Sequence, residues 1–203
     1  MITIRDRIKQ RIDDQFQYLE MMIERFPLLI ENYKKEQESE FKIIASEVAD
    51  GDKEIEYSVH SELSKALDSL PLENEMFNNA MLLIIYSYYE SVINLLAKNI
   101  GTKQQIDAIC QTKKITMSDE IQKEIDFLDD NVRYLRNQIA HNNNGTFRKE
   151  AKLLNIISSF DDLCLNDDTI CIKSKQFLLN ILQREYKVLS FLSKGLGYKT
   201  KMV

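Results

Sequence analysis

Apolar residues recur at steps of three and four along the N-terminal segment. Between residues 3 and 26 they are Ile4, Ile8, Ile12, Phe16, Leu19, Ile23 and Phe26, and charged or amide side chains fill most other positions. This spacing places one apolar stripe along a helix. Pro27 allows a kink or a new helix start. We therefore expect residues 1–50 to form a long kinked helix or a helical hairpin that projects from the core, followed by a shorter helix within 53–70.

A second apolar run predicts the central helix of the protein over residues 75–99. Asn74 can cap its start and Gly101 can end it. The polar exceptions recur at steps of three and four and form one stripe along this helix: Ser87, Glu90, Ser91, Asn94 and Lys98. A buried carboxylate such as that of Glu90 needs a cationic or hydrogen-bonding partner.

The rest of the chain predicts further helices and a short hairpin. Helical patterns cover 103–111, 118–141, about 147–160 and 175–193, with Ser118 and Ser174 as the capping residues of the second and the last. Between the last two helices, residues 163–165 and 169–172 flank a polar turn, which is typical of two short strands. The predicted fold is all-α, a helical bundle with one small β-hairpin near the C-terminal helix. We expect a single domain over 1–203 whose residues 75–195 form the bundle.

The composition excludes several classes of protein. Five glycines and two prolines in 203 residues disfavour turn-rich β folds and Gly-rich phosphate loops. The net charge of -5 excludes a uniformly basic nucleic-acid binder, but it allows a local basic patch. No apolar stretch is long enough to span a membrane, and three cysteines without a C-x-x-C pair are typical of reduced thiols. We expect a cytoplasmic protein without membrane association, metal or cofactor.

The candidate chemistry gathers at the end of the helix predicted over 118–141. His141 closes the segment Arg-Tyr-Leu-Arg-Asn-Gln-Ile-Ala-His, which begins at Arg133 and contains Arg136 and Asn137. The negative end of the helix dipole favours an imidazolium there. Arg133, Asn137 and His141 share one helix face, but Arg136 lies about 140° around the helix from His141. A site that uses both requires a distorted helix end or a second subunit. The other histidine, His60, lies in a polar stretch and is expected to be incidental.

The charge around this histidine predicts an anionic ligand. Residues 131–153 carry one acid, Glu150, and five cations: Arg133, Arg136, Arg148, Lys149 and Lys152. Arginine binds phosphate through a planar fork, and histidine exchanges protons near neutral pH. RNA cleavage needs a base for the 2′-OH, an acid for the departing 5′-oxygen and a cation beside the phosphorane.

The segment resembles the HEPN superfamily, whose members carry an R-x4-6-H motif, often with Asn after the Arg. The resemblance covers mainly residues 75–145. It implies a helical domain, commonly a homodimer with the active site at the interface, and a metal-independent endoribonuclease that leaves 2′,3′-cyclic phosphate and 5′-OH ends. Such enzymes serve in toxin–antitoxin and anti-phage systems, so an antitoxin or defence partner protein is also implied.

Residue by residue, the resemblance implies catalytic roles for Arg136, His141 and Asn137. Glu90 is a looser match to an acid that some members hold against the motif, and Arg133 supports the site. The nearby cations Arg148, Lys149 and Lys152 are candidate RNA-binding residues. One branch of the family is silenced by a nucleotidyltransferase antitoxin at a tyrosine two residues after the histidine. Here that position is Asn143, so we do not predict that partner.

Other interpretations remain open at this point. Arg136 could serve only as an ion-pair partner of Glu90 or Asp130, and His141 only as a helix cap. The chain could then be a non-catalytic HEPN module that binds RNA, nucleotide or a partner protein. It could also be an interaction protein that docks a partner through its N-terminal helices, with a coincidental motif.

Overall fold

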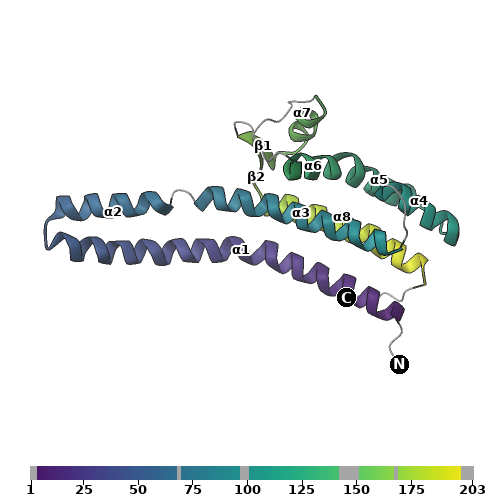
Figure 1. Cartoon of the computed structure of the whole chain (residues 1–203), viewed down its shortest axis with the longest axis horizontal. Coiled ribbons are helices and arrows are strands. Elements are labelled where there is room, and N and C mark those ends of the chain that lie inside the picture. The colour runs from purple at the N-terminus through teal and green to yellow at the C-terminus, as the bar shows by residue number, and fades with distance from the viewer. Residues whose placement is uncertain (1–3, 68–69, 97–100, 142–150, 167–168, 198–203) are drawn as a thin grey trace.

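The computed structural model describes residues 4–67, 70–96, 101–141, 151–166 and 169–197 (Figure 1). Its elements in chain order are α1 (Ile4–Ala49), α2 (Lys53–Leu67), α3 (Leu70–Leu96), α4 (Thr102–Lys113), α5 (Asp119–Phe127), the π-helical segment η1 (Leu128–Val132), α6 (Arg133–His141), α7 (Ala151–Ser158), β1 (Leu163–Asn166), β2 (Thr169–Ile172) and α8 (Lys175–Gly195). The fold is an all-α bundle with one antiparallel hairpin directly before the C-terminal helix, which confirms the predicted fold class.

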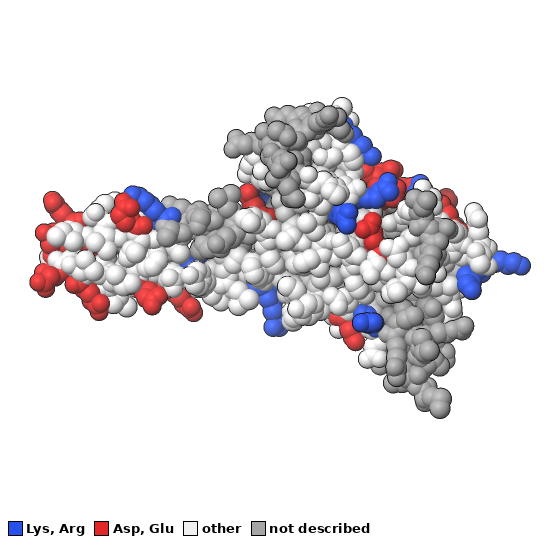
Figure 2. Space-filling view, viewed as in Figure 1, with Lys and Arg blue, Asp and Glu red and all other residues white. Residues whose placement is uncertain are grey.

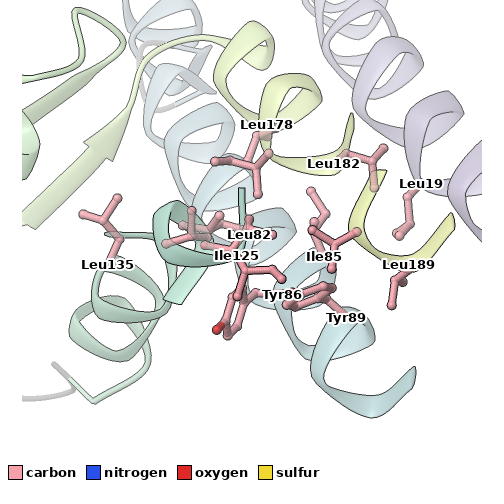
Figure 3. Packing of buried hydrophobic residues seen from close by; sticks show 14 of the residues in the cluster. Leu19, Leu82, Ile85, Tyr86, Tyr89, Ile125, Leu135, Leu178, Leu182 and Leu189 are labelled. Carbon is pink, nitrogen blue, oxygen red and sulfur yellow. The ribbon is translucent and has the colours of Figure 1, made fainter. Parts of the chain in front are cut away.

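The centre of the bundle is the pair α3 and α8. Helix α1 packs on one side of this pair, while α5 and α6 pack on the other (Figure 1). Every one of these helices contributes to a common apolar core (Figure 3), including Leu19, Leu82, Ile85, Tyr86, Tyr89, Ile125, Leu135, Leu178, Leu182 and Leu189. Full burial of one such side chain stabilises the fold by about 1.5–3 kcal/mol.

Helix α1 is continuous through Pro27, so of the two alternatives for residues 1–50 the protein has the long helix. Proline lacks an N–H and leaves one helical hydrogen bond unmade. Ile12, Phe16, Leu19 and Ile23 enter the core, and the distal half of α1 pairs with α2 outside the bundle. We call residues 28–67 the arm. A hairpin does exist, but its second helix is α2 rather than a part of residues 1–50.

Helix α3 begins at Leu70, five residues earlier than the pattern predicted. Pro71 explains the difference, because a proline in the first helical turn loses no hydrogen bond. The polar stripe predicted along α3 is only partly described, because Lys98 lies outside the described residues. Ser87, Ser91 and Asn94 are exposed and Glu90 is half-buried, so the described part of the stripe lies on the outer surface of the helix.

Two asparagines of α3 hold the hairpin. In β1 and β2 Leu163 pairs with Ile172 and Leu165 with Ile170. The Nδ2 of Asn78 donates to the Ile172 carbonyl at 2.8 Å, and the Nδ2 of Asn79 donates to the Ile170 carbonyl at 2.8 Å. These bonds satisfy carbonyls that an edge strand would otherwise leave open.

The helix predicted over 118–141 begins as expected but is not uniform. The Oγ of Ser118 accepts the N–H of Ile121, which confirms the predicted cap. Residues 128–132 are π-helical, and the N–H of Arg133 bonds the Leu128 carbonyl. The apolar spacing of the segment does not reveal this wider turn. It lies directly before the motif, and such segments are frequent at functional sites.

Candidate functional site

The guanidinium of Arg136 reaches from α6 to α3 and is held at two points. Its Nη2 lies 3.4 Å from the Oε2 of Glu90, and its Nη1 donates to the Oδ1 of Asn137 at 2.9 Å. The side chains of Arg136 and Glu90 are only 25% and 27% exposed. The Nε of Arg136 is buried and has no hydrogen-bond partner among the described residues. Three of the predicted site residues are thus in direct contact.

A buried carboxyl lies near this ion pair and was missed by the sequence analysis. Glu185 of α8 is fully buried, and neither of its carboxyl oxygens has a hydrogen-bond partner in the described part of the chain. Burial, and then the charge of Glu90, raise the pKa of Glu185 well above its ordinary value. The structure therefore favours the neutral form of this carboxyl.

The sequence does contain a signal for Glu185. The position falls at helical spacing between Leu182 and Leu189, so it lies on the apolar stripe of the C-terminal helix. Two tyrosines of α3, Tyr86 and Tyr89, lie near the buried carboxyl of Glu185. Burial raises the pKa of both Tyr86 and Tyr89, and the carboxylates of Glu90 and Asp129 raise that of Tyr86 further. Both rings belong to the core.

Arg133 has an acidic partner of its own in the π-helical segment. Its Nη2 lies 3.3 Å from the Oδ2 of Asp129, while the other carboxylate oxygen of Asp129 is buried without a hydrogen-bond partner among the described residues. Each arginine of the motif is therefore matched with one carboxylate. The matched acids fix where the two cations lie and offset part of their charge.

His141 is placed differently from Arg136. It is the last residue of α6, it is exposed, and it makes no hydrogen bond or ion pair with the described residues. Helix α6 is regular from 133 to 141, so the two side chains diverge by about 140° around it. The helix-end distortion that would bring them together is not found up to residue 141. Within one described chain the pair does not meet.

The predicted RNA-binding cations are only partly described. Arg148, Lys149 and the departure at Asn143 lie outside the described residues. Lys152 stands on α7, and its Nζ lies 5.0 Å from the centre of the Tyr134 ring, a cation–π contact. Tyr134 precedes His141 by seven residues, so both lie on one face of α6, about 10 Å apart along its axis.

His60 lies far from the motif, on the arm. It lines a surface hollow of about 390 Å³ together with Lys42, Tyr57 and other residues of α1 and α2. Its Nε2 is buried and has no hydrogen-bond partner among the described residues. Nothing in this hollow connects it with the contacts around Arg136.

The described residues hold no group of three or more His, Cys, Asp or Glu side chains that could bind a metal ion. Over the same residues, no helix is both long and apolar enough to cross a bilayer. Comparison of the chain with protein-family models, with curated proteins and with solved structures finds no match. The HEPN resemblance rests on the motif residues of the chain itself.

Proposed function

We propose that this protein is a metal-independent endoribonuclease of the toxin or anti-phage defence type. The observation that carries the proposal is the restrained guanidinium of Arg136, which is held by Glu90 of α3 and by Asn137. The short helix α6, which carries Arg136, also presents the exposed His141. A fixed cation and an accessible imidazole are the groups that cleavage by 2′-OH attack requires.

In the proposed reaction, His141 accepts the proton of the 2′-OH, and a water molecule supplies the proton that the departing 5′-oxygen takes up. The 2′-oxygen bonds to phosphorus as the bond from phosphorus to the 5′-oxygen breaks, which leaves a 2′,3′-cyclic phosphate and a 5′-OH. Arg136 stabilises the charged phosphorane. Asn137 supports it, because its Oδ1 accepts from Arg136 and its amide N–H groups remain donors for the phosphate.

The proposed active unit is a homodimer with the site at its interface. The divergence of Arg136 and His141 on a regular helix supports this, because a second copy can place its own motif beside the same phosphate. An antitoxin or another defence protein is the proposed regulator of this activity.

A non-catalytic HEPN module that binds RNA, nucleotide or a partner protein is the second candidate. The observation that favours it is that Glu90 and Asn137 already occupy part of the guanidinium of Arg136. Such an arginine would serve as a structural ion pair, and the basic residues nearby would bind a ligand without cleaving it.

The test is RNA cleavage in excess EDTA by the wild-type protein and by His141→Ala, with His60→Ala as the matched control. We expect wild type and His60→Ala to leave cyclic phosphate ends, and His141→Ala to lose about 10²–10⁴-fold in rate. His141 is exposed, so the thermal stability of the variant should equal that of the wild type. RNA binding without cleavage by any of the three proteins would favour the binding module. Equal cleavage by all three would remove His141 from the mechanism.

A further inference from the structure

A hollow beside the motif faces η1 on one wall and α7 on the other. Its volume is about 390 Å³, and it is lined by Asn131, Lys152, Asn155, Ile156, Ser159 and Phe160. Binding sites for small molecules range over about 300–1,000 Å³, so this hollow fits one small ligand rather than a folded partner. Its α7 residues lie on a single face of that helix, because they follow each other at steps of three and four.

The lining combines an apolar floor with free polar groups. Ile156 is buried and Phe160 half-buried, while Lys152, Asn155 and Ser159 are exposed at the rim. Phe160 is also held edge-to-face by Phe127 and Phe177, at centroid distances of 5.9 and 5.5 Å. A fixed aromatic ring at the base of a hollow is a surface on which a nucleobase can stack.

Two amides stand ready to hydrogen-bond such a base. Neither Asn131 nor Asn155 has a side-chain hydrogen bond within the described part of the chain, so each offers a donor and an acceptor. Ser159 donates to the Asn155 carbonyl at 2.7 Å, which leaves its Oγ as an acceptor. Lys152 is the charged residue of the lining, and it is a cation that suits a phosphate.

The hollow lies close to His141 along helix α6. Lys152 contacts the ring of Tyr134, which shares its face of α6 with His141 about 10 Å further along the helix. A short stretch of extended single strand can span that distance. In a duplex, the base edges that the two amides would bind are already paired, so the hollow requires an unpaired nucleotide.

We infer that the hollow between η1 and α7 is a subsite for one unpaired nucleotide of a single-stranded RNA, close to the phosphate that His141 serves. The base stacks on Phe160, the amides of Asn131 and Asn155 read its edge, and Lys152 binds its phosphate. This inference rests on the proposed function for the cleavage step, but not for the binding step.

The test uses the full-length protein, Asn131→Ala, Asn155→Ala and the control Gln111→Ala. Gln111 is exposed and lines a different hollow, near α4. Each protein is titrated calorimetrically with the four nucleoside monophosphates at millimolar concentration, and the ends of cleaved random-sequence single-stranded RNA are sequenced. We expect the wild type and Gln111→Ala to bind the same preferred nucleotide. The two asparagine variants should bind it about ten- to a hundredfold more weakly and lose the matching base preference in cleavage.

The outcomes separate this inference from the proposed function. Nucleotide binding that the asparagine variants lose, in a protein that cleaves no RNA, keeps the subsite and overturns the nuclease. Cleavage with unchanged base preference and unchanged nucleotide binding in both asparagine variants overturns the subsite and keeps the nuclease. A wild-type protein that binds none of the four nucleotides also overturns the subsite.

Discussion

The arm and the bundle differ in what they do with apolar and charged side chains. In the bundle, Leu178 and its neighbours are fully buried; on the arm, Leu29 and Val48 are 64% and 59% exposed. Among the described residues, none between 24 and 76 is a buried member of the core cluster. The arm carries ten acidic and five basic residues, while the rest of the chain has 22 of each. Acidic side chains are concentrated at the free end of the arm (Figure 2).

This contrast shows that a helical pattern predicts a helix better than it predicts burial. The same steps of three and four run along both halves of α1, but only the first half meets α3 and α8. Burial depends on how many elements converge on a face, and the arm has a single partner helix for each of its two helices. The same reasoning distinguishes the exposed ion pairs of the arm from the partly buried ion pair of the bundle. Lys35 and Glu31 pair on the arm at 68% and 59% exposure, whereas Arg136 and Glu90 pair at 25% and 27%.

The largest expected difference lies between these two ion pairs. Arg136→Ala should lower RNA cleavage by about 10²–10³-fold, because the cation beside the phosphorane is lost. Lys35→Ala should leave the rate unchanged, since an exposed pair contributes only about 0.2–1 kcal/mol to stability. Initial rates of both variants are compared well below their unfolding temperatures. Equal rates would place Arg136 with the structural ion pairs and favour the binding module.

Core packing gives the next contrast. Leu178→Ala should lower the free energy of unfolding by about 2–5 kcal/mol, because it leaves a cavity between α8 and α3. Leu29→Ala on the arm should change it by less than about 0.5 kcal/mol. Urea denaturation of both variants measures the difference. A comparable loss for Leu29→Ala would mean that the arm is covered by another chain in solution.

The buried carboxyl of Glu185 predicts a dependence of stability on pH. Its pKa is raised in the folded protein, so its contribution is fully present below the unfolded value of about 4.5 and is lost as the pH rises through the folded pKa. Glu185→Gln removes this loss and should stabilise the protein at pH 8 by roughly 1–3 kcal/mol relative to wild type. Near pH 5 the two should be closer in stability. Thermal unfolding across this range is the measurement.

A matched control for this prediction has the opposite sign. Hydrogen bonding by Lys187 lowers the pKa of Glu120, an exposed residue of α5, so its contribution is present above pH 4.5 and is lost as the pH falls. Glu120→Gln should therefore not stabilise the protein at pH 8. If both variants gained stability there, general charge repulsion rather than burial of Glu185 would explain the effect.

The smallest effect is expected from removing the arm. Phe26 and Phe77 stack at 3.7 Å where α1 and α3 enter the bundle, so a short Gly–Ser linker can replace residues 28–67. The bundle should then unfold within about 2–4 °C of the intact protein, which corresponds to about 1 kcal/mol for a chain of this size. Scanning calorimetry measures this shift. Loss of function with the bundle intact would support the partner-docking interpretation of the N-terminal helices.

Local signals account for the parts of the fold that the sequence predicted correctly. Ser118 and Ser174 cap their helices through their own hydroxyls, and the hairpin follows from a polar turn between two apolar runs. The π-helical segment and the burial of Glu185 were not predicted. The π-helical segment leaves the apolar spacing intact. The burial of Glu185 depends on the packing of α3 against α8, which no local sequence pattern predicts. The contact between Arg136 and Glu90 was one of two predicted ion pairs, the other being with Asp130. It followed from the need of a carboxylate on an apolar helix for a partner, and from the resemblance, which implies an acid against the motif.

The packing of α1 against α8 has a consequence for synthesis of the chain. Phe16 meets the ring of Tyr186 at 5.1 Å, and the Tyr186 hydroxyl donates to Asp13 at 3.1 Å, so the beginning of the chain is held by its last helix. During translation the N-terminal half of α1 can contact α3, for example through Phe16 and Tyr88, but it lacks its second packing surface until α8 has left the ribosome. The contacts between α1 and α8, which are far apart in the sequence, therefore form late in folding. A nascent chain that stops before α8 lacks half of its central helix pair, and with it the surface on which α5 and η1 pack.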